Sequence, residues 1–167
     1  MLSLDYVAGY IDGEGCITIL YWQDKRRLNK KFNGYEFRPY FGVHTKDLDV
    51  IKQLSPFFDS YGIHTSTYLN RHPTSLRKYE PTHKIDCVNW DNIAKICNLL
   101  KPHVIAKKEV MKLFLEAYSI RKSPGRSKRG YLCSLMNENE FIVVHSIMCK
   151  IRKINKGIFY KDIPLGF

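Results

Sequence analysis

The spacing of apolar residues changes several times along the chain, and each change marks a new element. The first apolar set has the three- and four-residue spacing of one helix face and consists of Leu4, Val7, Ala8 and Ile11. Ser3 is placed to cap this helix, and Gly13 with Gly15 is expected to end it. Residues 16–22 and 35–43 are rich in β-branched and aromatic side chains and flank a long basic turn. The pattern predicts a short helix and then a β-hairpin with a charged tip.

Helical and strand patterns continue to alternate after this hairpin. A helix is predicted from Thr45 to Tyr61, with Asp47 or Thr45 as its cap and Gly62 closing it. A second hairpin is predicted from HTSTYLNR (64–71) and HKIDCVN (83–89), and further helices over 90–100, 106–119 and about 137–156. This order indicates an α+β fold in which helices cover one face of a four-stranded antiparallel sheet and leave the other face open.

Composition and charge suggest what the open face is for. The chain has 167 residues, 44% of them apolar, which is enough for the core of a single domain over 1–167. Lys and Arg number 27 against 16 Asp and Glu, a net charge of +11. This excess points to a polyanionic partner, and it favours nucleic acid over an anionic membrane.

The cysteines and the N-terminus exclude several other classes of protein. Five cysteines, at 16, 87, 97, 133 and 149, form no CxxC pair, so neither a disulfide framework nor a zinc knuckle is indicated. No apolar stretch approaches the roughly 20 residues of a membrane span, and the start of the chain lacks the pattern of a signal peptide. We expect a soluble intracellular protein with reduced thiols, in the cytoplasm or in an organelle.

Alternation along the strands indicates which side chains face a nucleic acid. If Ile17, Ile19 and Tyr21 point at the helices, their neighbours on the first strand point outward. A two-stranded ribbon fits the major groove of DNA, and basic, aromatic and amide side chains contact phosphates and bases. The expected DNA contacts are Thr18, Leu20, Trp22, Lys25, Arg26, Arg27, Lys30, Lys31, Arg38, Tyr40, Thr67, Tyr68, Asn70 and Arg71.

The stretch VAGYIDGEG (7–15) carries the candidate chemistry. Gly9 and Gly13 are four residues apart, and such a face lets two helices approach until their backbones nearly touch. Asp12 and Glu14 would then lie at the helix C-terminus, and a second copy would bring another carboxylate nearby. Clustered carboxylates and exposed carbonyls suit Mg²⁺, which can activate water for phosphodiester hydrolysis.

Two simpler interpretations of this stretch are an ordinary turn and a calcium-binding loop. The tetrapeptide DGEG alone is an ordinary turn in many proteins. An EF-hand loop would need an oxygen ligand at Cys16, glycine at Ile17 and glutamate at Gln23, and none of these is present.

The longer string is more specific, because VAGYIDGEG resembles the LAGLIDADG signature of homing endonucleases. The matching residues are Ala8, Gly9, Ile11, Asp12 and Gly15, and Glu14 replaces the second aspartate of the signature. The family's repeating unit is α-β-β-α-β-β-α, which is the order predicted above. The resemblance therefore covers a core of about 3–100 and extends by analogy into a C-terminal helical extension of about 101–167.

The resemblance implies a saddle-shaped sheet that binds double-stranded DNA, with two signature helices packed at the centre. The family cleaves both strands across the minor groove by metal-assisted hydrolysis, with Mg²⁺ as the expected ion and Mn²⁺ as a substitute. A chain with one signature should act as a homodimer. The target would be long and pseudo-palindromic, and this fold would recognise it through direct, water-mediated and shape contacts without a one-residue-one-base code.

Individual roles follow from the same resemblance. Glu14 would bind the metal, with the carbonyl of Gly13 as a further ligand, and Asp12 would cap and brace the helix pair that Gly9 lets approach. The run KPHVIAKKE (101–109) resembles the segment that places a basic residue near the active-site water, which favours Lys107, with Lys108 as the reserve. Thr45 occupies the place of a polar residue in the family's water network.

Two rival functions remain open from the sequence. Relatives of this fold act as maturases, which bind intron RNA and help it to splice, and a third possibility is a DNA-binding regulator that does not cleave. A regulator would be expected to lose the metal-binding acid, so Glu14 argues against it but not against a maturase. An intein-embedded nuclease is disfavoured because Met1 is not a splicing nucleophile. An intron-encoded enzyme that stands alone is the simplest account.

Overall fold

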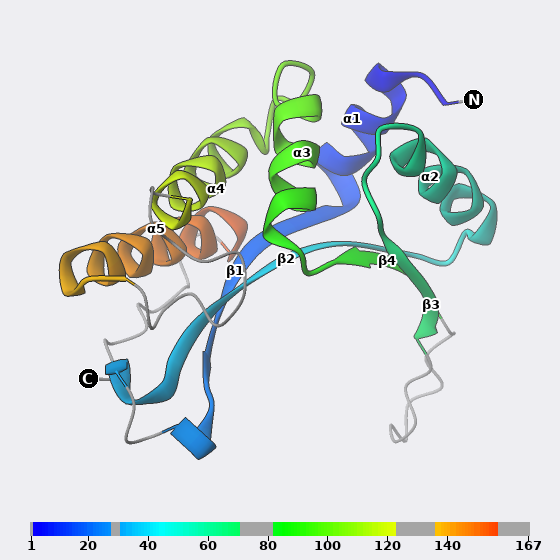
Figure 1. Cartoon of the computed structure of the whole chain (residues 1–167). Helices are drawn as coiled ribbons and strands as arrows, with labels where there is room; N and C mark the ends of the chain where they lie inside the picture. Colours follow the sequence, from blue (N-terminus) through cyan, green and yellow to red (C-terminus); the bar gives the residue numbers. More distant parts are fainter. Residues whose placement is uncertain (1, 28–30, 71–81, 123–135, 157–167) are drawn as a thin grey trace.

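The computed structural model describes residues 2–27, 31–70, 82–122 and 136–156, and Figure 1 shows how their helices and strands are arranged. In chain order the elements are α1 (Leu4–Glu14), β1 (Gly15–Gln23), two short 3₁₀ turns η1 (Lys25–Arg27) and η2 (Lys31–Gly34), β2 (Tyr35–Thr45), α2 (Leu48–Ser60), β3 (Ser66–Asn70), β4 (Thr82–Cys87), α3 (Trp90–Leu100), α4 (Lys108–Arg121) and α5 (Glu138–Lys156).

The four strands form one antiparallel sheet in the order β1-β2-β4-β3. Both predicted hairpins are confirmed, since β1 pairs with β2 and β3 pairs with β4. The hairpins join in the middle of the sheet, where residues from Phe41 to Thr45 of β2 pair with residues from His83 to Cys87 of β4. Because the joining strands are central, β1 and β3 are the two edges.

The helices lie on one face of the sheet, and its other face is open, as the side view in Figure 1 shows. Residues that point at the helices are fully buried, among them Ile17, Ile19, Phe41, Val43 and Ile85. The sheet curves so that its two ends bend away from the helices. The predicted α+β architecture, with helices on one face, is therefore confirmed.

The C-terminal helix shares its core with the first hairpin. The turn before β2 places Phe32, at φ 57°, in the left-handed region that side chains rarely adopt. This conformation lets the buried ring of Phe32 stack on Phe141 of α5, with ring centroids 4.0 Å apart. Phe37 of β2 packs on the same Phe141 ring at 4.7 Å. Aromatic contacts of this kind hold α5 against the long hairpin.

The first helix ends at Glu14, between the two glycines that were expected to end it, and Gly15 follows as its cap. One predicted boundary was wrong. The second helix does not start at Thr45, because β2 extends through that residue to pair with β4. Asp47, one of the two predicted caps, is the cap, and its carboxylate accepts hydrogen bonds from the N–H groups of Asp49 (2.9 Å) and Val50 (3.3 Å).

Two further expectations concern thiols and membranes. Within the described chain Cys16, Cys87, Cys97 and Cys149 are free thiols, and Cys133 lies outside the described residues. Among the described helices, none combines the length and the apolar character that crossing a membrane requires.

Candidate functional site

The end of α1 places the acidic residues where the helix gives way to a strand. Ser3 caps the helix as predicted, accepting a hydrogen bond from the N–H of Tyr6 at 3.2 Å. Gly15 lies directly against the last turn, and a Cβ atom there would come within 2.7 Å of the Ile11 carbonyl oxygen. Only glycine fits so close a turn, because that approach is shorter than any normal contact. The preceding residue, Glu14, therefore stands exposed at the junction.

One face of α1 carries no cover. Gly9 and Gly13 are both exposed, and a Cβ atom built at either would meet no atom within 4 Å. The opposite face is anchored in the core by Val7, Ala8 and Ile11, all fully buried. The helix is thus fixed on one side and bare along its two glycines on the other.

Asp12 ties α1 to the turn before α4. Its carboxylate accepts hydrogen bonds from the backbone N–H groups of Ile105 (2.7 Å), Ala106 (2.9 Å) and Lys107 (2.8 Å). Burial alone would raise the pKa of Asp12, but these three N–H groups and the charge of Lys107 hold the pKa below its usual value. Asp12 is therefore ionised at neutral pH and fully engaged within its own chain.

The side chain of Lys107 also binds to α1. Its ammonium group donates a 2.6 Å hydrogen bond to the backbone carbonyl of Asp12, two residues before Glu14. A cation at this place is favoured because the C-terminal end of a helix carries partial negative charge. The structure thus joins Asp12 to Lys107, two of the residues that the sequence had singled out, and Glu14 follows Asp12 at the end of the same helix.

Thr45, the other predicted catalytic residue, forms its hydrogen bond with the start of the next helix. It is the last residue of β2, and its hydroxyl oxygen accepts a hydrogen bond from the N–H of Asp47 at 3.1 Å. Along the strand it lies two residues beyond Val43, the partner of Gly15. The structure records no contact between Thr45 and Glu14, so its place in a water network stays a prediction.

The open face of the sheet displays part of the predicted contact set. Leu20 and Trp22 of β1 are 41% and 50% exposed. Arg38 of β2 lies over the Trp22 ring at 4.7 Å from its centroid, so the two side chains form a cationic and aromatic pair. Lys25 in η1 is exposed near the hairpin tip. These side chains have the chemistry to contact phosphates and bases.

Three predicted contacts have other surroundings. Thr18 lies on the open face by alternation but is buried. Arg26 holds the carboxylate of Asp24 with two hydrogen bonds of 3.0 and 3.1 Å. Thr67 pairs with the inward-facing Ile85 and lines a cavity beside α2, so it lies on the helix side of β3 and not on the open face.

The other predicted contacts cannot be placed by side chain. Lys30 and Arg71 lie outside the described residues, and the side chains of Arg27, Lys31 and Asn70 are not described.

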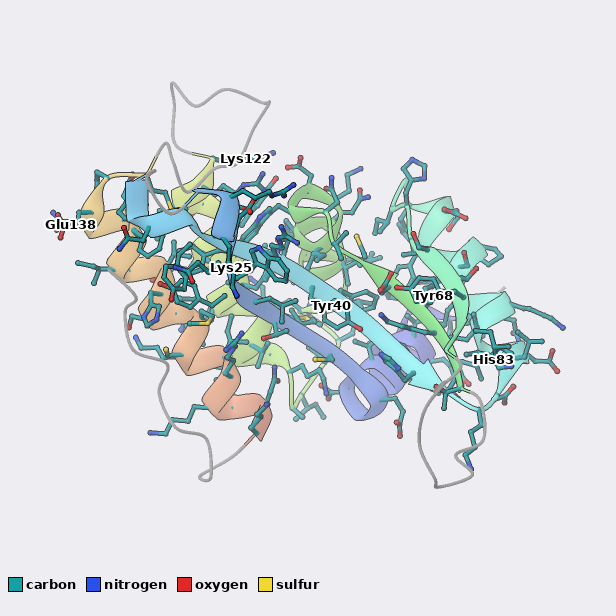
Figure 2. The ribbon with its side chains drawn as sticks, turned by 90° about the horizontal axis from the view of Figure 1, so that it is seen from below. Lys25, Tyr40, Tyr68, His83, Lys122 and Glu138 are labelled. Carbon is teal, nitrogen blue, oxygen red and sulfur yellow. The ribbon has the colours of Figure 1, made fainter. Side chains whose placement is uncertain are left out.

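Part of the open face, on the central strands, was not among the predicted contacts. Figure 2 views this face from below, with Tyr40 and Tyr68 marked on it. Lys84 and Asp86 of β4 lie with these tyrosines, since Lys84 pairs with Tyr68 across the strands. The signal was present in HKIDC, where buried Ile85 and Cys87 alternate with the two charged residues.

The C-terminal helix makes a contact that no sequence pattern indicated. The side-chain amide of Asn155, near the end of α5, donates a 2.8 Å hydrogen bond to the backbone carbonyl of Ile17. Ile17 belongs to β1, the edge strand that begins directly after Glu14. The end of α5 is therefore attached beside the start of this strand.

Comparison with known proteins agrees with this geometry. The family model described as LAGLIDADG endonuclease matches residues 7–105. No curated protein sequence matches the chain significantly. The homing endonuclease I-TnaI superposes with a TM-score of 0.65 at 18% identity, covering 93% of this chain and 95% of its own.

Two further solved structures are similar in fold. The archaeal intron-encoded homing endonuclease I-Vdi141I, complexed with DNA, has a TM-score of 0.70 at 16% identity, covering 97% of this chain and 89% of its own. I-SmaMI, bound to uncleaved DNA in the presence of calcium ions, has a TM-score of 0.66 at 16% identity and covers 100% of this chain. This chain spans 53% of the length of I-SmaMI.

Proposed function

Because the chain belongs to the LAGLIDADG endonuclease family, we propose that it is an intron-encoded homing endonuclease. It would cut both strands of a long pseudo-palindromic DNA target as a homodimer. One observation carries the proposal above the others. Glu14 is exposed at the end of α1, two residues after the Asp12 carbonyl that binds the Lys107 ammonium group, and the same helix carries the bare glycine face.

The donor groups at this end of α1 fit a magnesium ion. Mg²⁺ is typically held by one or two carboxylates and keeps water molecules and phosphate oxygens in its other positions. Across the described part of the chain, no three His, Cys, Asp or Glu side chains gather into a closed metal site. Asp12 is occupied by three N–H groups, so one subunit offers Glu14 and the carbonyl of Gly13. A bound Mg²⁺, or Mn²⁺ in its place, lowers the pKa of water and stabilises the leaving oxygen.

Lys107 and Thr45 are assigned supporting roles. The ammonium group of Lys107 has three donors and uses one on the Asp12 carbonyl, which leaves others for a water molecule or a phosphate oxygen. It can thereby orient the attacking water and offset the charge that develops on the phosphate. The Thr45 hydroxyl accepts from Asp47 and keeps its own hydrogen for a water molecule.

A second subunit would pack on the glycine face of α1. The bare surface at Gly9 and Gly13 admits the backbone of another helix, and an isologous contact between two copies would bring both Glu14 carboxylates near one axis. The chain length of I-SmaMI supports this arrangement. This chain spans 53% of that protein, so two copies of it correspond to about one I-SmaMI chain.

The open face of the sheet would hold the DNA. The net charge of +11 per chain supports binding to phosphates, and the pair formed by Arg38 and Trp22 is suited to base edges near the hairpin end. Lys25 would contact the backbone of the duplex.

A cleavage assay tests the proposal. The protein is incubated with Mg²⁺ and a library of duplexes that carry candidate intron-insertion sequences, and the cut ends are mapped, with EDTA as the control. Double-strand breaks at one sequence that disappear in EDTA would support it. Specific binding to RNA without cleavage would instead favour a maturase, and specific DNA binding without cleavage would favour a regulator.

Replacing Gly9 with leucine is expected to separate the subunits without weakening either one. The new side chain meets nothing within its own chain, and leucine is favoured over glycine in a helix by about 1 kcal/mol. In the dimer it would stand between two closely packed backbones, at a cost of at least about 1–3 kcal/mol. We expect a monomer in sedimentation velocity, a thermal midpoint no lower than that of the native protein, and loss of double-strand cutting.

The matched control is Ser146→Leu, which adds the same side chain to an exposed position of α5 and should leave the dimer intact. A Gly9→Leu protein that sediments as a dimer and cuts normally would show that the subunits do not meet on this face.

A further inference from the structure

A compact polar cluster occupies the middle of the open face, on the three strands β2, β3 and β4. Its centre is an ion pair in β4, with the Lys84 ammonium 2.6 Å from the Asp86 carboxylate. The hydroxyl of Tyr68 donates to Asp86 and lies 3.1 Å from the Lys84 ammonium. The hydroxyl of Tyr40 is 3.2 Å from Nε2 of His44. We call these five residues the β4 cluster.

The lysine at the centre is enclosed. Its ammonium lies 5.2 Å from the centroid of the Tyr40 ring and 4.9 Å from that of Tyr68. The Lys84 side chain is only 15% exposed, and that of Asp86 9%. Burial would lower the pKa of Lys84, but its hydrogen bonds to Asp86 and Tyr68 raise the pKa above its usual value. The lysine therefore stays charged, and its charge is used inside the cluster.

The strand register explains why the cluster forms here. Lys84 stands directly between Tyr68 of β3 and His44 of β2. Asp86 pairs with Gly42, which has no side chain, and Tyr40 lies along the space this leaves. A Cβ atom at Gly42 would collide with the Tyr40 hydroxyl. Glycine at this position is what allows the Tyr40 ring to reach Lys84.

A lysine without a partner on a DNA-binding face binds any phosphate, because phosphate contacts carry no sequence information. A lysine tied to a carboxylate does not add such a contact. Ring edges and hydroxyls held in fixed positions contact the edges of particular bases. A carboxylate on the same face also repels a misplaced phosphate.

On these grounds we infer that the β4 cluster determines sequence specificity, with Asp86 as its positioning residue. Asp86 keeps Lys84 away from the DNA phosphates and holds Tyr68 beside it, while the enclosed Lys84 fixes Tyr40, so that both tyrosines meet base edges. The inference rests on the proposed function only in taking DNA as the ligand of this face. It does not depend on cleavage.

The test is Asp86→Asn, which keeps the shape and can still accept the hydrogen bond from Tyr68. Binding is measured in EDTA over a range of salt concentrations, first to a random-sequence duplex and then to a duplex selected from a randomised pool by the native protein. Freed from its carboxylate, Lys84 should add about one phosphate contact, so the slope of log K against log salt should steepen by about 0.9 per subunit. The preference for the selected duplex should fall on the order of tenfold.

The matched control is Asp91→Asn. Asp91 also binds a tyrosine and a lysine, Tyr118 at 2.6 Å and Lys122 at 3.0 Å, but it does so between α3 and α4 and not on the sheet. The Asp91→Asn substitution removes the same charge as Asp86→Asn. It should leave the salt slope and the preference for the selected duplex nearly unchanged. An equal effect of both variants would mean that net charge alone is responsible, which would overturn the inference.

A second variant guards against loss of folding. Asp86→Asn combined with Lys84→Gln has no charge at either position and frees no lysine. It should therefore bind the random duplex with the native salt slope while the preference for the selected duplex stays reduced. If Asp86→Asn and the double variant both keep the native salt slope and the native preference for the selected duplex, the cluster only stabilises the sheet. Because no readout requires cutting, a failure here is distinct from a failure of the endonuclease proposal.

Discussion

Glu14→Gln is expected to abolish DNA cleavage while leaving specific binding intact. The amide keeps the shape of the side chain but removes the charge that would hold a divalent ion at the end of α1. Without that ion water is a poor nucleophile, with a pKa near 15.7, so we expect the cutting rate to fall by at least about 10³-fold. The rate is measured by single-turnover cleavage, and affinity by a binding assay on the same duplex.

Binding should survive because its energy comes from the sheet and its basic residues. It is even expected to tighten in the absence of metal, since Glu14 in each subunit would repel nearby phosphates. Replacing Mg²⁺ by Ca²⁺ in the native protein should likewise favour binding over cutting, because the larger ion accepts looser geometry.

The control for charge is Glu116→Gln, on the exposed side of α4, which should cut normally. Full cutting by a Glu14→Gln preparation free of native enzyme would contradict the assignment. Asp12 would not be the alternative ligand, because both of its carboxylate oxygens already accept backbone hydrogen bonds.

The second large effect is expected from Asp12→Ala, and it concerns stability. The substitution leaves three backbone N–H groups without their acceptor and removes the attachment of α1 to the turn before α4. Hydrogen bonds to a charged group contribute about 1.5–3 kcal/mol each. Since such losses are not additive, we expect the free energy of unfolding to fall by about 3 kcal/mol, measured by urea denaturation. Cutting should fall as well, because the turn that carries Lys107 loses its attachment to the end of α1.

The pH dependence gives this prediction a second readout. The pKa of Asp12 is lower in the folded protein than its ordinary value of 3.8. A carboxylate of this kind stabilises the fold fully above the unfolded pKa, and the contribution is lost as pH falls through the folded value. The gap in stability between native protein and Asp12→Ala should therefore be constant near neutral pH and should narrow below about pH 3.8.

The comparison variant is Asp5→Ala on the same helix. Asp5 pairs with His103 at 2.8 Å, but its side chain is 86% exposed, and exposed pairs contribute little. Equal losses for Asp5→Ala and Asp12→Ala would show that the attachment of α1 to the turn before α4 is not special.

Local patterns predicted the helices and strands well, because each depends on residues close in sequence. Ser3, Val7 and Ile11 define α1 through a cap and a buried face, and the structure confirms both. The end of the same helix lies between Gly13 and Gly15, as expected, and the close approach of Gly15 to Ile11 explains why glycine stands there. The start of α2 was misplaced because β4 holds Thr45 in the strand.

Contacts between distant segments could not be predicted from one sequence. The partners of the Asp12 carboxylate lie more than 90 residues further along the chain, so its role in the fold was inaccessible. The β4 cluster needs the register of three strands, and neither Lys84 nor Asp86 stands out in its own segment. Glu14 and Lys107 were chosen through a family resemblance, and physical pattern alone supplied only a pair of acids between glycines.

The hydrogen bond from Asn155 to Ile17 has a consequence for the chain during its synthesis, because it joins the last described helix to the first strand. β1 leaves the ribosome early, and as an edge strand it has unpaired backbone groups that can recruit a strand from another chain. The helix that Asn155 attaches to the start of β1 is α5, the last of the described elements to be synthesised. During translation there is therefore a period in which β1 has been synthesised but α5 has not. In that period the exposed edge can aggregate with other chains, and chaperones or a low expression level would reduce this aggregation.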